Sequence, residues 1–367
     1  MKIIHVTQFL GIGGLEKIIF HLILEQMAQG HDVALYVYDH DREWLPYFQK
    51  MGISIIPTPQ KKRGYDFQLI KRMHRDLMDA DVIHTHDLNP LMYLFIIFFL
   101  RRCFYFKVPR LIHTTHGLGH VERFPKYKIF EKYITPIADK IVAVSEKVGA
   151  FYTKELNISS EKIIVIENGI STFSGPITKA MRSEKKTWLC SRHKLDHNRP
   201  VIVSLSRILP LKDQLFIIKA FKKRPMYQLL VVGPASDQHY FDECKKWEDQ
   251  NMIMTGAQEL VSEYNLGADL YVSASTHEGI PVAVLEAMAV ETPCLVSSIP
   301  GHKTLNQYGT AVDFFEPHQE AQFLDLCDKI LINKDHQKEK VELARKIVED
   351  HFSVKKMVNE YMREYSR

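Results

Sequence analysis

Two glutamates, Glu278 and Glu286, stand eight positions apart in the segment HEGIPVAVLEAMA (277–289), which follows a strand-like run and opens a helix. The spacing predicts that the first glutamate lies in the loop and the second in the helix, where they can hold two different parts of one ligand. Carboxylates accept hydrogen bonds from vicinal hydroxyls, the groups that sugars and riboses offer. Taken singly, either glutamate is more simply explained as a residue without a ligand.

The same segment supplies backbone donors. The amides of Gly279, Ile280 and Val282 lie near the predicted N-terminus of the helix, a position that suits a phosphate group. Pro281 contributes no donor because its nitrogen carries no hydrogen. The segment therefore predicts a ligand that carries both hydroxyls and a phosphate.

A pair of cations follows another strand-like run. Arg207 and Lys212, in SRILPLKD (206–213), leave the carboxyl end of the run at 201–206, the end at which ligands bind to open α/β sheets. One bidentate guanidinium and one mobile ammonium can neutralise a diphosphate. An arginine and a lysine at this spacing are common on protein surfaces. They indicate a ligand site only together with the two glutamates.

A glycine cluster, GIGGLEK (11–17), stands between the first strand-like run and the first helical pattern. Gly13 and Gly14 there allow either a tight turn alone or a close approach to an anionic group at the helix N-terminus. The dinucleotide fingerprint GxGxxG requires a glycine at the position of Glu16. The cluster therefore disfavours a nicotinamide-dependent dehydrogenase.

Two histidine pairs close predicted strands of the first half, His84 with His86 in VIHTHD and His113 with His116 in HTTHG. Each histidine is equally well explained as a hydrogen-bonded core residue. The sequence contains no HExxH motif and no cysteine–histidine set. We therefore expect no metal site and no cofactor.

These residues require elements that bring strand ends together. Short β-branched runs alternate with helical patterns, which is typical of buried parallel strands. The runs lie at 2–7, 32–38, 53–56, 81–85, 110–115, 140–144 and 162–166, and then at 201–206, 228–233, 252–256, 269–274 and 294–298. The fold class is therefore α/β, with two doubly wound, Rossmann-like domains facing across a cleft.

We place the boundaries of these domains as follows. The N-terminal domain covers 1–170, a polar interdomain connection with some helix in it covers 171–200, and the C-terminal domain covers 201–350. Residues 351–367 form a terminal amphipathic helix, with Ser353 as its expected N-cap.

Composition removes several classes of protein. Of 367 residues, 46% are hydrophobic and 25% are charged, which are ordinary values for globular domains. The net charge of +4 is too small for a nucleic-acid partner. Five scattered cysteines and the lack of a signal peptide predict a cytoplasmic protein. The longest apolar run, 91–100, is too short to span a bilayer.

The motifs together resemble the retaining, nucleotide-sugar-dependent glycosyltransferases of family four. The resemblance runs from Gly11 to about Gly301 and is carried chiefly by the Glu-x7-Glu segment, with the Arg/Lys pair at its expected distance upstream. It implies the GT-B architecture, with an acceptor-binding domain first, a nucleotide-sugar donor domain second and a C-terminal helix that packs back on the first domain.

The resemblance also implies roles for individual residues. Glu278 would hold the transferred sugar and Glu286 the ribose, while Arg207 and Lys212 would bind the diphosphate and stabilise its developing charge. The remaining assignments are His116 beside the donor sugar, His86 on the acceptor side, Gly13 and Gly14 near the diphosphate, Gly233 near the nucleotide, and Gly279, Ile280 and Val282 as donor-binding amides.

The implied reaction moves a hexose or N-acetylhexosamine, with retention and without a metal, from a UDP-sugar to a glycan or lipid-linked acceptor of polysaccharide or glycolipid biosynthesis; GDP-mannose is the second choice of donor. The alternatives are an epimerase or phosphorylase of the same architecture, or a non-catalytic nucleotide-sugar-binding protein.

The charge distribution suggests a further partner. Residues 1–180 carry 23 basic and 18 acidic side chains, whereas the remainder carries 25 and 26. Basic and aromatic residues interleave at 101–110, and more lysines follow at 126–132. This pattern is expected either of peripheral contact with an anionic membrane at the inner face, or of a buried helix with a solvated end.

Overall fold

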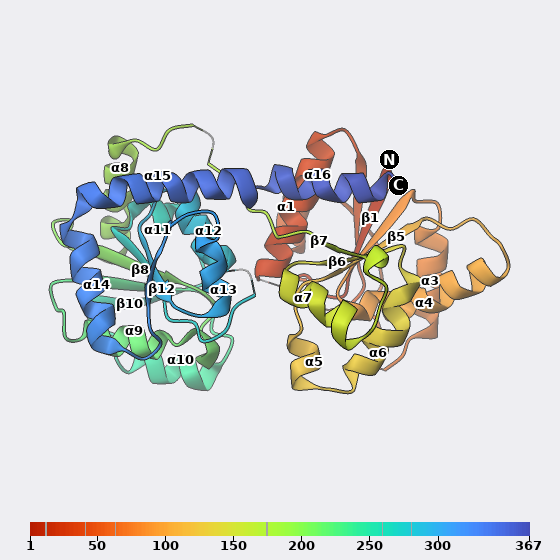
Figure 1. Ribbon diagram of the computed structural model, residues 1–367, viewed down its shortest axis with the longest axis horizontal. Helices are drawn as coiled ribbons and strands as arrows, with labels where there is room; N and C mark the ends of the chain where they lie inside the picture. Colours follow the sequence, from red (N-terminus) through yellow and green to blue (C-terminus); the bar gives the residue numbers. More distant parts are fainter. Residues whose placement is uncertain (12, 41, 63, 174, 259, 280) are drawn as a thin grey trace. The chain divides into compact units, whose positions relative to one another are not determined.

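The computed structural model divides the chain into two compact units (Figure 1). The first unit comprises Met1–Gly169 and Val354–Arg367, and the second comprises Ile170–Ser353. The structure describes every residue except 12, 41, 63, 174, 259 and 280, and it leaves out the side chains of 122 and 334–336. The predicted donor-binding residue Ile280 lies outside the described residues.

Among the described residues, the first unit contains a parallel sheet of seven strands in the order β3-β2-β1-β4-β5-β6-β7. Because both faces are covered, most of the strands are buried along almost their whole length. The strands are β1 (Lys2–Thr7), β2 (Asp32–Val37), β3 (Ser54–Ile56), β4 (Val82–His86), β5 (Arg110–Thr115), β6 (Lys140–Ala143) and β7 (Ile163–Val165).

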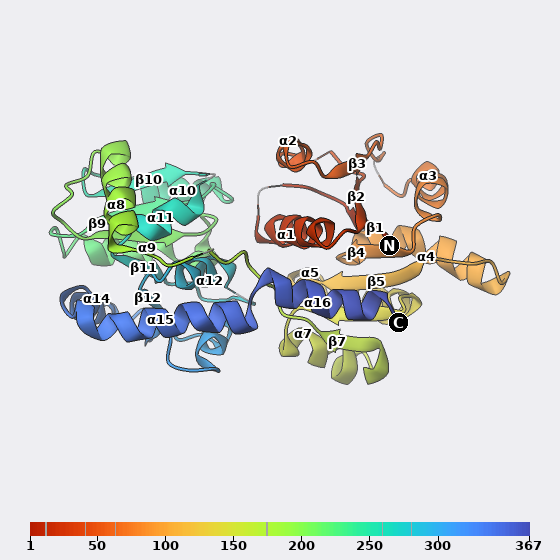
Figure 2. The same ribbon diagram turned by 90° about the horizontal axis from the view of Figure 1, so that it is seen from above.

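The helices of this unit lie on both sides of the sheet (Figure 2). They are α1 (Gly14–Ala28), α2 (Leu45–Lys50), α3 (Phe67–Leu77), α4 (Leu88–Cys103), α5 (Gly119–Arg123), α6 (Tyr127–Ile134), α7 (Glu146–Ala150) and α16 (Val354–Tyr365). Shorter turns are the 3-10 helices η1 (Thr135–Ile137) and η3 (Ser160–Lys162) and the π-helical turn η2 (Phe151–Glu155).

The C-terminal helix α16 belongs to the first unit, where it packs beside α1. Its inner face carries Tyr361 and Tyr365, both buried. The Tyr361 hydroxyl lies 3.0 Å from Thr114 Oγ1, and Arg110 Nε donates to the carbonyl oxygen of Glu364 at 2.5 Å. The last helix therefore packs side chains against a sheet whose first strand begins more than 300 residues earlier.

The second unit contains, among its described residues, a parallel sheet of six strands in the order β10-β9-β8-β11-β12-β13. The strands are β8 (Val201–Leu205), β9 (Gln228–Val232), β10 (Met252–Gly256), β11 (Leu270–Ser273), β12 (Cys294–Ser297) and β13 (Asp313–Phe315). The sequence patterns did not predict β13, because its three residues, Asp313 to Phe315, include no β-branched side chain.

The helices of the second unit include one from the stretch 171–200, which the sequence assigned to an interdomain connection. They are α8 (Lys179–His193), α9 (Gln214–Phe221), α10 (Gln238–Lys245), α11 (Val261–Gly267), α12 (Val282–Ala289), α13 (Pro300–Lys303), α14 (Glu320–Ile332) and α15 (Lys334–His351), with the 3-10 helices η4 (Pro210–Lys212) and η5 (Thr304–Asn306).

The observed boundaries differ from the expected ones in the polar stretch 171–200. Helix α8 fills half of it, begins with Thr178 as a side-chain cap for Met181 N–H at 3.2 Å, and buries Leu189 and Cys190 in the core of the second unit. The sequence predicts some helix here but not that it joins the second unit, because the helix is mostly polar and only a narrow stripe of it is buried. The second unit also extends to Ser353, a few residues beyond the expected end at 350.

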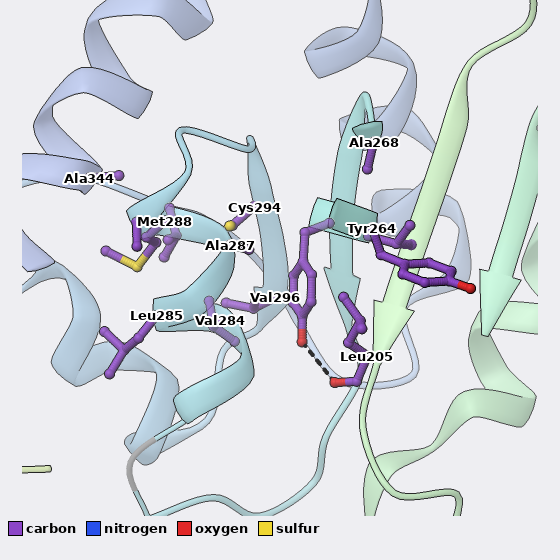
Figure 3. Packing of buried hydrophobic residues seen from close by; sticks show 14 of the residues in the cluster. Leu205, Tyr264, Ala268, Val284, Leu285, Ala287, Met288, Cys294, Val296 and Ala344 are labelled. Carbon is purple, nitrogen blue, oxygen red and sulfur yellow. Dashed lines mark hydrogen bonds between the residues drawn. The ribbon is translucent and has the colours of Figure 1, made fainter. Parts of the chain in front are cut away.

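Helix α12 is fixed firmly in the second unit. Its side chains Val284, Leu285, Ala287 and Met288 enter one buried cluster with strands β8, β11 and β12 (Figure 3). The hydroxyl of Tyr271 donates to the carbonyl oxygen of Leu205 at 3.2 Å, which satisfies the one polar group of that side chain within an apolar core. The helix that carries Glu286 is thus anchored by its apolar face.

Candidate functional site

The carboxyl ends of β8 and β11 bring Lys212 and Glu278 together. The two strands are neighbours in the sheet, and Lys212 ends η4, which follows β8, while Glu278 stands in the loop after β11. The Lys212 ammonium donates to Glu278 Oε1 in a close ion pair, with side chains only 17% and 15% exposed. Residues 66 positions apart in the chain therefore form one charged centre.

A chain of hydroxyl groups orients Glu278. Ser275 Oγ donates to Glu278 Oε1 at 2.7 Å, and Ser273 Oγ lies 3.2 Å from Ser275 Oγ. Ser297, at the end of the next strand β12, donates from its Oγ to the carbonyl oxygen of Ser275 at 2.5 Å. The carboxylate is therefore held by its own loop rather than free to swing.

Gly301 and His302, at the start of α13, are parts of this centre that sequence reasoning did not assign. A Cβ on Gly301 would lie 2.4 Å from the carbonyl oxygen of Glu278, so only glycine lets α13 pack against that loop. His302 is buried, and burial lowers its pKa; its Nδ1 lies 2.8 Å from the carbonyl oxygen of Ser297. The motif IPGHKTL contains both, but nothing local in it indicates the contact with Glu278.

Arg207 and Gly233 lie at adjacent strand ends. Arg207 follows β8 and is exposed, and its carbonyl oxygen accepts from Gln214 Nε2 at 2.9 Å. Gly233 follows β9 with φ of +148° and donates its N–H to the carbonyl oxygen of Gly256 at 2.9 Å. A Cβ there would lie 1.9 Å from the carbonyl oxygen of Ser206, the residue before Arg207. Gly233 thus shapes the turn that presents Arg207.

The remaining donor-binding candidates surround the start of α12. Val282 is its first residue, and the first turn bonds from the N–H groups of Val284 and Leu285 to the carbonyl oxygen of Pro281, at 3.0 and 3.1 Å. Gly279 is exposed, and a Cβ on it would meet no atom within 4 Å in the part of the chain that the structure describes. Glu286 lies one turn into the helix and is half-buried.

Gly13 and Gly14 stand, as predicted, at the junction between β1 and α1. Gly13 is the N-cap in extended conformation, and Gly14 is the first helical residue. A Cβ on Gly14 would meet no atom of the described residues within 4 Å, whereas one on Gly13 would lie 2.6 Å from the flexible Glu16 carboxylate. The turn is open on the side of Gly14.

His86 and His116 lie side by side in the first unit. His86 Nδ1 is 3.0 Å from His116 Nε2, and His86 Nε2 is 3.0 Å from His5 Nδ1. The register of the sheet explains this cluster: His5 pairs with His84 across β1 and β4, and the period of two places His84 and His86 on one face. The sequence indicates the pairs His84/His86 and His113/His116, but no local pattern connects His5 to them.

Burial dominates the electrostatics of this cluster. It lowers the pKa of His5 to about 4 and that of His116 to about 3, and it lowers the pKa values of His84 and His86 well below the ordinary value. All four imidazoles are therefore neutral at physiological pH. His5, His84 and His86 lie close enough together to be candidate metal ligands.

A second polar network in the first unit was not predicted. Glu131 is buried, and its carboxylate oxygens lie 2.7 Å from His120 Nε2 and from the Tyr152 hydroxyl. Burial by itself would lower the pKa of His120, but the hydrogen bond and charge of Glu131 outweigh it, so the pKa is raised. His120 lies on α5 and Glu131 on α6, 11 positions apart, and neither residue belongs to a motif.

Two family comparisons cover most of the chain. Residues 12–172 match the family described as Glycosyltransferase Family 4. Residues 190–347 match the family described as Glycosyl transferases group 1. The first match ends three residues beyond the main segment of the first unit, and the second match lies wholly within the second unit.

Curated relatives carry related names. The chain is 26% identical to the UDP-Gal:alpha-D-GlcNAc-diphosphoundecaprenol alpha-1,3-galactosyltransferase of Escherichia coli over 54% of each chain, and so spans about half the length of that relative. It is 21% identical to a GDP-mannose:cellobiosyl-diphosphopolyprenol alpha-mannosyltransferase of Xanthomonas oryzae, over 100% of this chain and 96% of the relative.

Solved structures show the same fold at low identity. The Anabaena protein HepE, crystallised with UDP and glucose, matches with a TM-score of 0.83 at 18% identity, over 100% of this chain and 99% of the other. A glycosyltransferase from Rickettsia africae matches with a TM-score of 0.80, also at 18% identity, over 99% and 97%. With the motifs and the two family matches, these findings identify the chain as a member of glycosyltransferase family 4 with the GT-B fold.

Proposed function

We propose that this protein transfers a hexose or N-acetylhexosamine from a nucleotide diphosphate sugar, with UDP-sugars as the first choice, to a glycan or lipid-linked acceptor, with retention of configuration and without a metal. The observation that carries the proposal is the Lys212–Glu278 ion pair at the ends of β8 and β11. It joins a cation suited to a diphosphate and a carboxylate suited to sugar hydroxyls in one centre. The second unit is then the donor-binding half and the first unit the acceptor-binding half.

In the proposed reaction the bond between the anomeric carbon and the diphosphate breaks, and negative charge builds on the leaving phosphate. Arg207 and Lys212 stabilise that charge, because fixed cations lower the free energy of a transition state that develops anionic character. Lys212 has three N–H donors and uses one on Glu278, so others remain for phosphate. The acceptor oxygen attacks from the face that the diphosphate leaves, and its proton passes to the leaving phosphate.

The names of two relatives support a lipid-linked acceptor. The Escherichia coli galactosyltransferase is named for a diphosphoundecaprenol substrate, and the Xanthomonas mannosyltransferase for a diphosphopolyprenol substrate. Their named donors, UDP-Gal and GDP-mannose, support the two nucleotide sugars expected from the sequence.

An assay without metal tests the reaction. Purified protein is incubated in excess EDTA with UDP-glucose, UDP-galactose, UDP-N-acetylglucosamine or GDP-mannose and a polyprenyl-diphosphate saccharide. We expect one donor to yield a new glycoside with the anomeric configuration of the donor, read by mass spectrometry and NMR. Turnover that requires a divalent metal contradicts the metal-independent mechanism. An isomerised free donor indicates an epimerase, and tight donor binding without product indicates a binding protein.

The first unit also carries a surface suited to a membrane. Large side chains at the end of α4 and in the turn after it are exposed, with Tyr105 96%, Phe104 68% and Phe106 61% exposed. Arg101 lies over the Phe106 ring at 5.4 Å. Helix α6, which contacts α4, adds Ile129 and Tyr133, both more than 60% exposed. We call the side chains at 99–106 and on α6 the aromatic–basic surface.

The proposal includes peripheral contact of the aromatic–basic surface with anionic lipid at the inner face of the membrane. Basic side chains are attracted to anionic headgroups, and aromatic side chains enter the interfacial region. Among the described residues, no helix has the length and apolar character needed to cross a bilayer. A peripheral enzyme could reach a lipid-linked acceptor in this way.

We expect Phe104→Ser/Phe106→Ser to weaken binding to vesicles rich in phosphatidylglycerol by at least about tenfold, because each ring loses apolar burial of roughly 1 kcal/mol or more. Co-sedimentation at low salt measures the partition. The matched control is Met226→Ser/Leu260→Ser, which removes two side chains that are 53% and 56% exposed in the second unit. Equal binding by the two double variants, or no binding by the unaltered protein, contradicts the membrane contact.

A further inference from the structure

A line of four polar side chains crosses the buried interior of the first unit. Gln26 Oε1 lies 2.8 Å from His5 Nε2, His5 Nδ1 lies 3.0 Å from His86 Nε2, and His86 Nδ1 lies 3.0 Å from His116 Nε2. We call Gln26, His5, His86 and His116 the histidine chain. Gln26, His5 and His86 are buried.

The histidine chain has a direction. A neutral imidazole carries one N–H and one lone pair, so a ring that donates at one nitrogen must accept at the other. Gln26 Oε1 carries no hydrogen, and His5 Nε2 must therefore donate to it. His5 Nδ1 then accepts from His86 Nε2–H, and His86 Nδ1 accepts from His116 Nε2–H. The amide oxygen of Gln26 thus sets the tautomer of all three rings.

The orientation of the Gln26 amide is itself supported from α16. Gln26 Nε2 donates to the Tyr365 hydroxyl at 3.3 Å, and that hydroxyl lies 2.6 Å from His84 Nδ1. With its nitrogen facing Tyr365, the amide presents its oxygen to His5. The C-terminal helix therefore helps to fix the direction of a chain that begins on α1.

The far end of the histidine chain is unsatisfied. His116 Nδ1 is buried and has no hydrogen-bond partner among the described residues. With His116 protonated at Nε2, its Nδ1 bears a lone pair and can accept a hydrogen bond. A buried acceptor without a donor costs free energy and calls for an explanation. His116 directly follows β5, at the carboxyl edge of the sheet, where ligands of open α/β sheets bind.

We propose that Gln26 is a positioning residue, which acts through His5 and His86 to hold His116 as the Nε2–H tautomer, so that His116 Nδ1 accepts a hydrogen bond from a substrate hydroxyl. The inference rests on the proposed function for the identity of that donor, a sugar hydroxyl. The direction of the chain is a property of the ligand-free protein and is measured without turnover.

The same atoms allow a competing reading as a metal site, since His5, His84 and His86 lie close enough together to hold an ion. Each of these three rings makes hydrogen bonds. His84, for example, has its Nε2 2.7 Å from Thr114 Oγ1. To coordinate a metal ion, these imidazoles would need the lone pairs that they already use to accept hydrogen bonds. The experiment separates the two readings.

The test uses the full chain labelled with ¹⁵N at histidine, with the His5, His86 and His116 signals assigned by single substitution to asparagine. We expect all three rings to show the neutral Nε2–H pattern, unchanged between about pH 5 and pH 9. Addition of UDP-glucose should shift His116 Nδ1 toward a hydrogen-bonded nitrogen, and UDP alone should shift it less. A proton on His116 Nδ1, or one equivalent of zinc held by the three rings, overturns the proposal.

Two substitutions at one position test the role of Gln26. Gln26→Met has similar size but no acceptor, and we expect a measurable Nδ1–H population at His116. If half of the molecules adopt that form, the KM for UDP-glucose rises about twofold with kcat unchanged, because only the competent tautomer binds. Gln26→Glu keeps an oxygen facing His5 and should keep the Nε2–H pattern.

The matched control is Thr85→Val. It removes a buried hydroxyl that lies 3.0 Å from His113 Nδ1, and so disturbs a neighbouring histidine outside the chain. We expect no change in the His116 tautomer. If Gln26→Met leaves that tautomer as it is, or Thr85→Val changes it equally, Gln26 has no positioning role. If the protein proves not to transfer sugars while His116 is Nε2–H, the proposed function fails and the direction of the chain stands.

Discussion

Replacing Glu278 by glutamine should lower kcat/KM for sugar transfer by at least about a hundredfold, which corresponds to about 2.7 kcal/mol. Glutamine has nearly the same shape and can still accept from Ser275, so the loop after β11 should keep its conformation. It lacks the charge that pairs with Lys212 and that strengthens hydrogen bonds to sugar hydroxyls. The loss should therefore appear in catalysis and not in folding.

Steady-state kinetics with the donor identified by the transfer assay, together with urea unfolding, separates these effects. Asp313→Asn is the matched control, because it breaks another partly buried ion pair of the second unit, with Lys340 at 2.6 Å and side chains 23% and 15% exposed. We expect the control to lose some stability and keep its activity. Wild-type kcat/KM in Glu278→Gln would remove Glu278 from the proposed mechanism.

Replacing Gly233 by alanine should destabilise the protein by at least about 3 kcal/mol. The added Cβ meets the carbonyl oxygen of Ser206 at 1.9 Å, and both atoms belong to backbone that no rotamer change can move. The φ of +148° adds conformational strain for any residue with a side chain. Overpacking and strain of this kind cost about 1–3 kcal/mol each.

Urea unfolding followed by circular dichroism measures this loss. Gly279→Ala is the control in the same unit, since a Cβ there meets none of the described atoms within 4 Å, and it should change the free energy of unfolding by less than about 1 kcal/mol. Gly233→Ala should also reduce activity in the molecules that remain folded, because Ser206 precedes Arg207. A variant as stable as the control would show that the turn relaxes freely.

The local features of this fold follow from local sequence patterns. Strands such as β1 and β5 match their predicted runs to the residue, because β-branched side chains fit the extended backbone of a sheet that is buried on both faces. The terminal helix also follows from the spacing of its apolar side chains. Strand β13 was missed because its three residues include no β-branched side chain. The helix expected in 171–200 was assigned to an interdomain connection, because α8 is mostly polar.

Part of the candidate site was also predictable from local sequence patterns. Glu278, Arg207 and Lys212 could be named because each follows a recognisable strand, and strand ends meet at one edge of a sheet. The contact of Gly301 with Glu278 could not, because it depends on how α13 packs after β12. His5 carried no signal of its own, and only its register opposite His84 brings it to His86.

The sequence by itself determined the α/β class, the order of most strands along the chain and the set of charged residues at their ends. These depend on hydrophobic periodicity and on turn chemistry, which act over a few residues. Tertiary structure alone decided which strands are neighbours, that Lys212 pairs with Glu278, and that Tyr365 of the last helix supports Gln26 of the first. These contacts join residues from 66 to 339 positions apart, and their free energy comes from burial and packing that only the assembled sheets and helices provide.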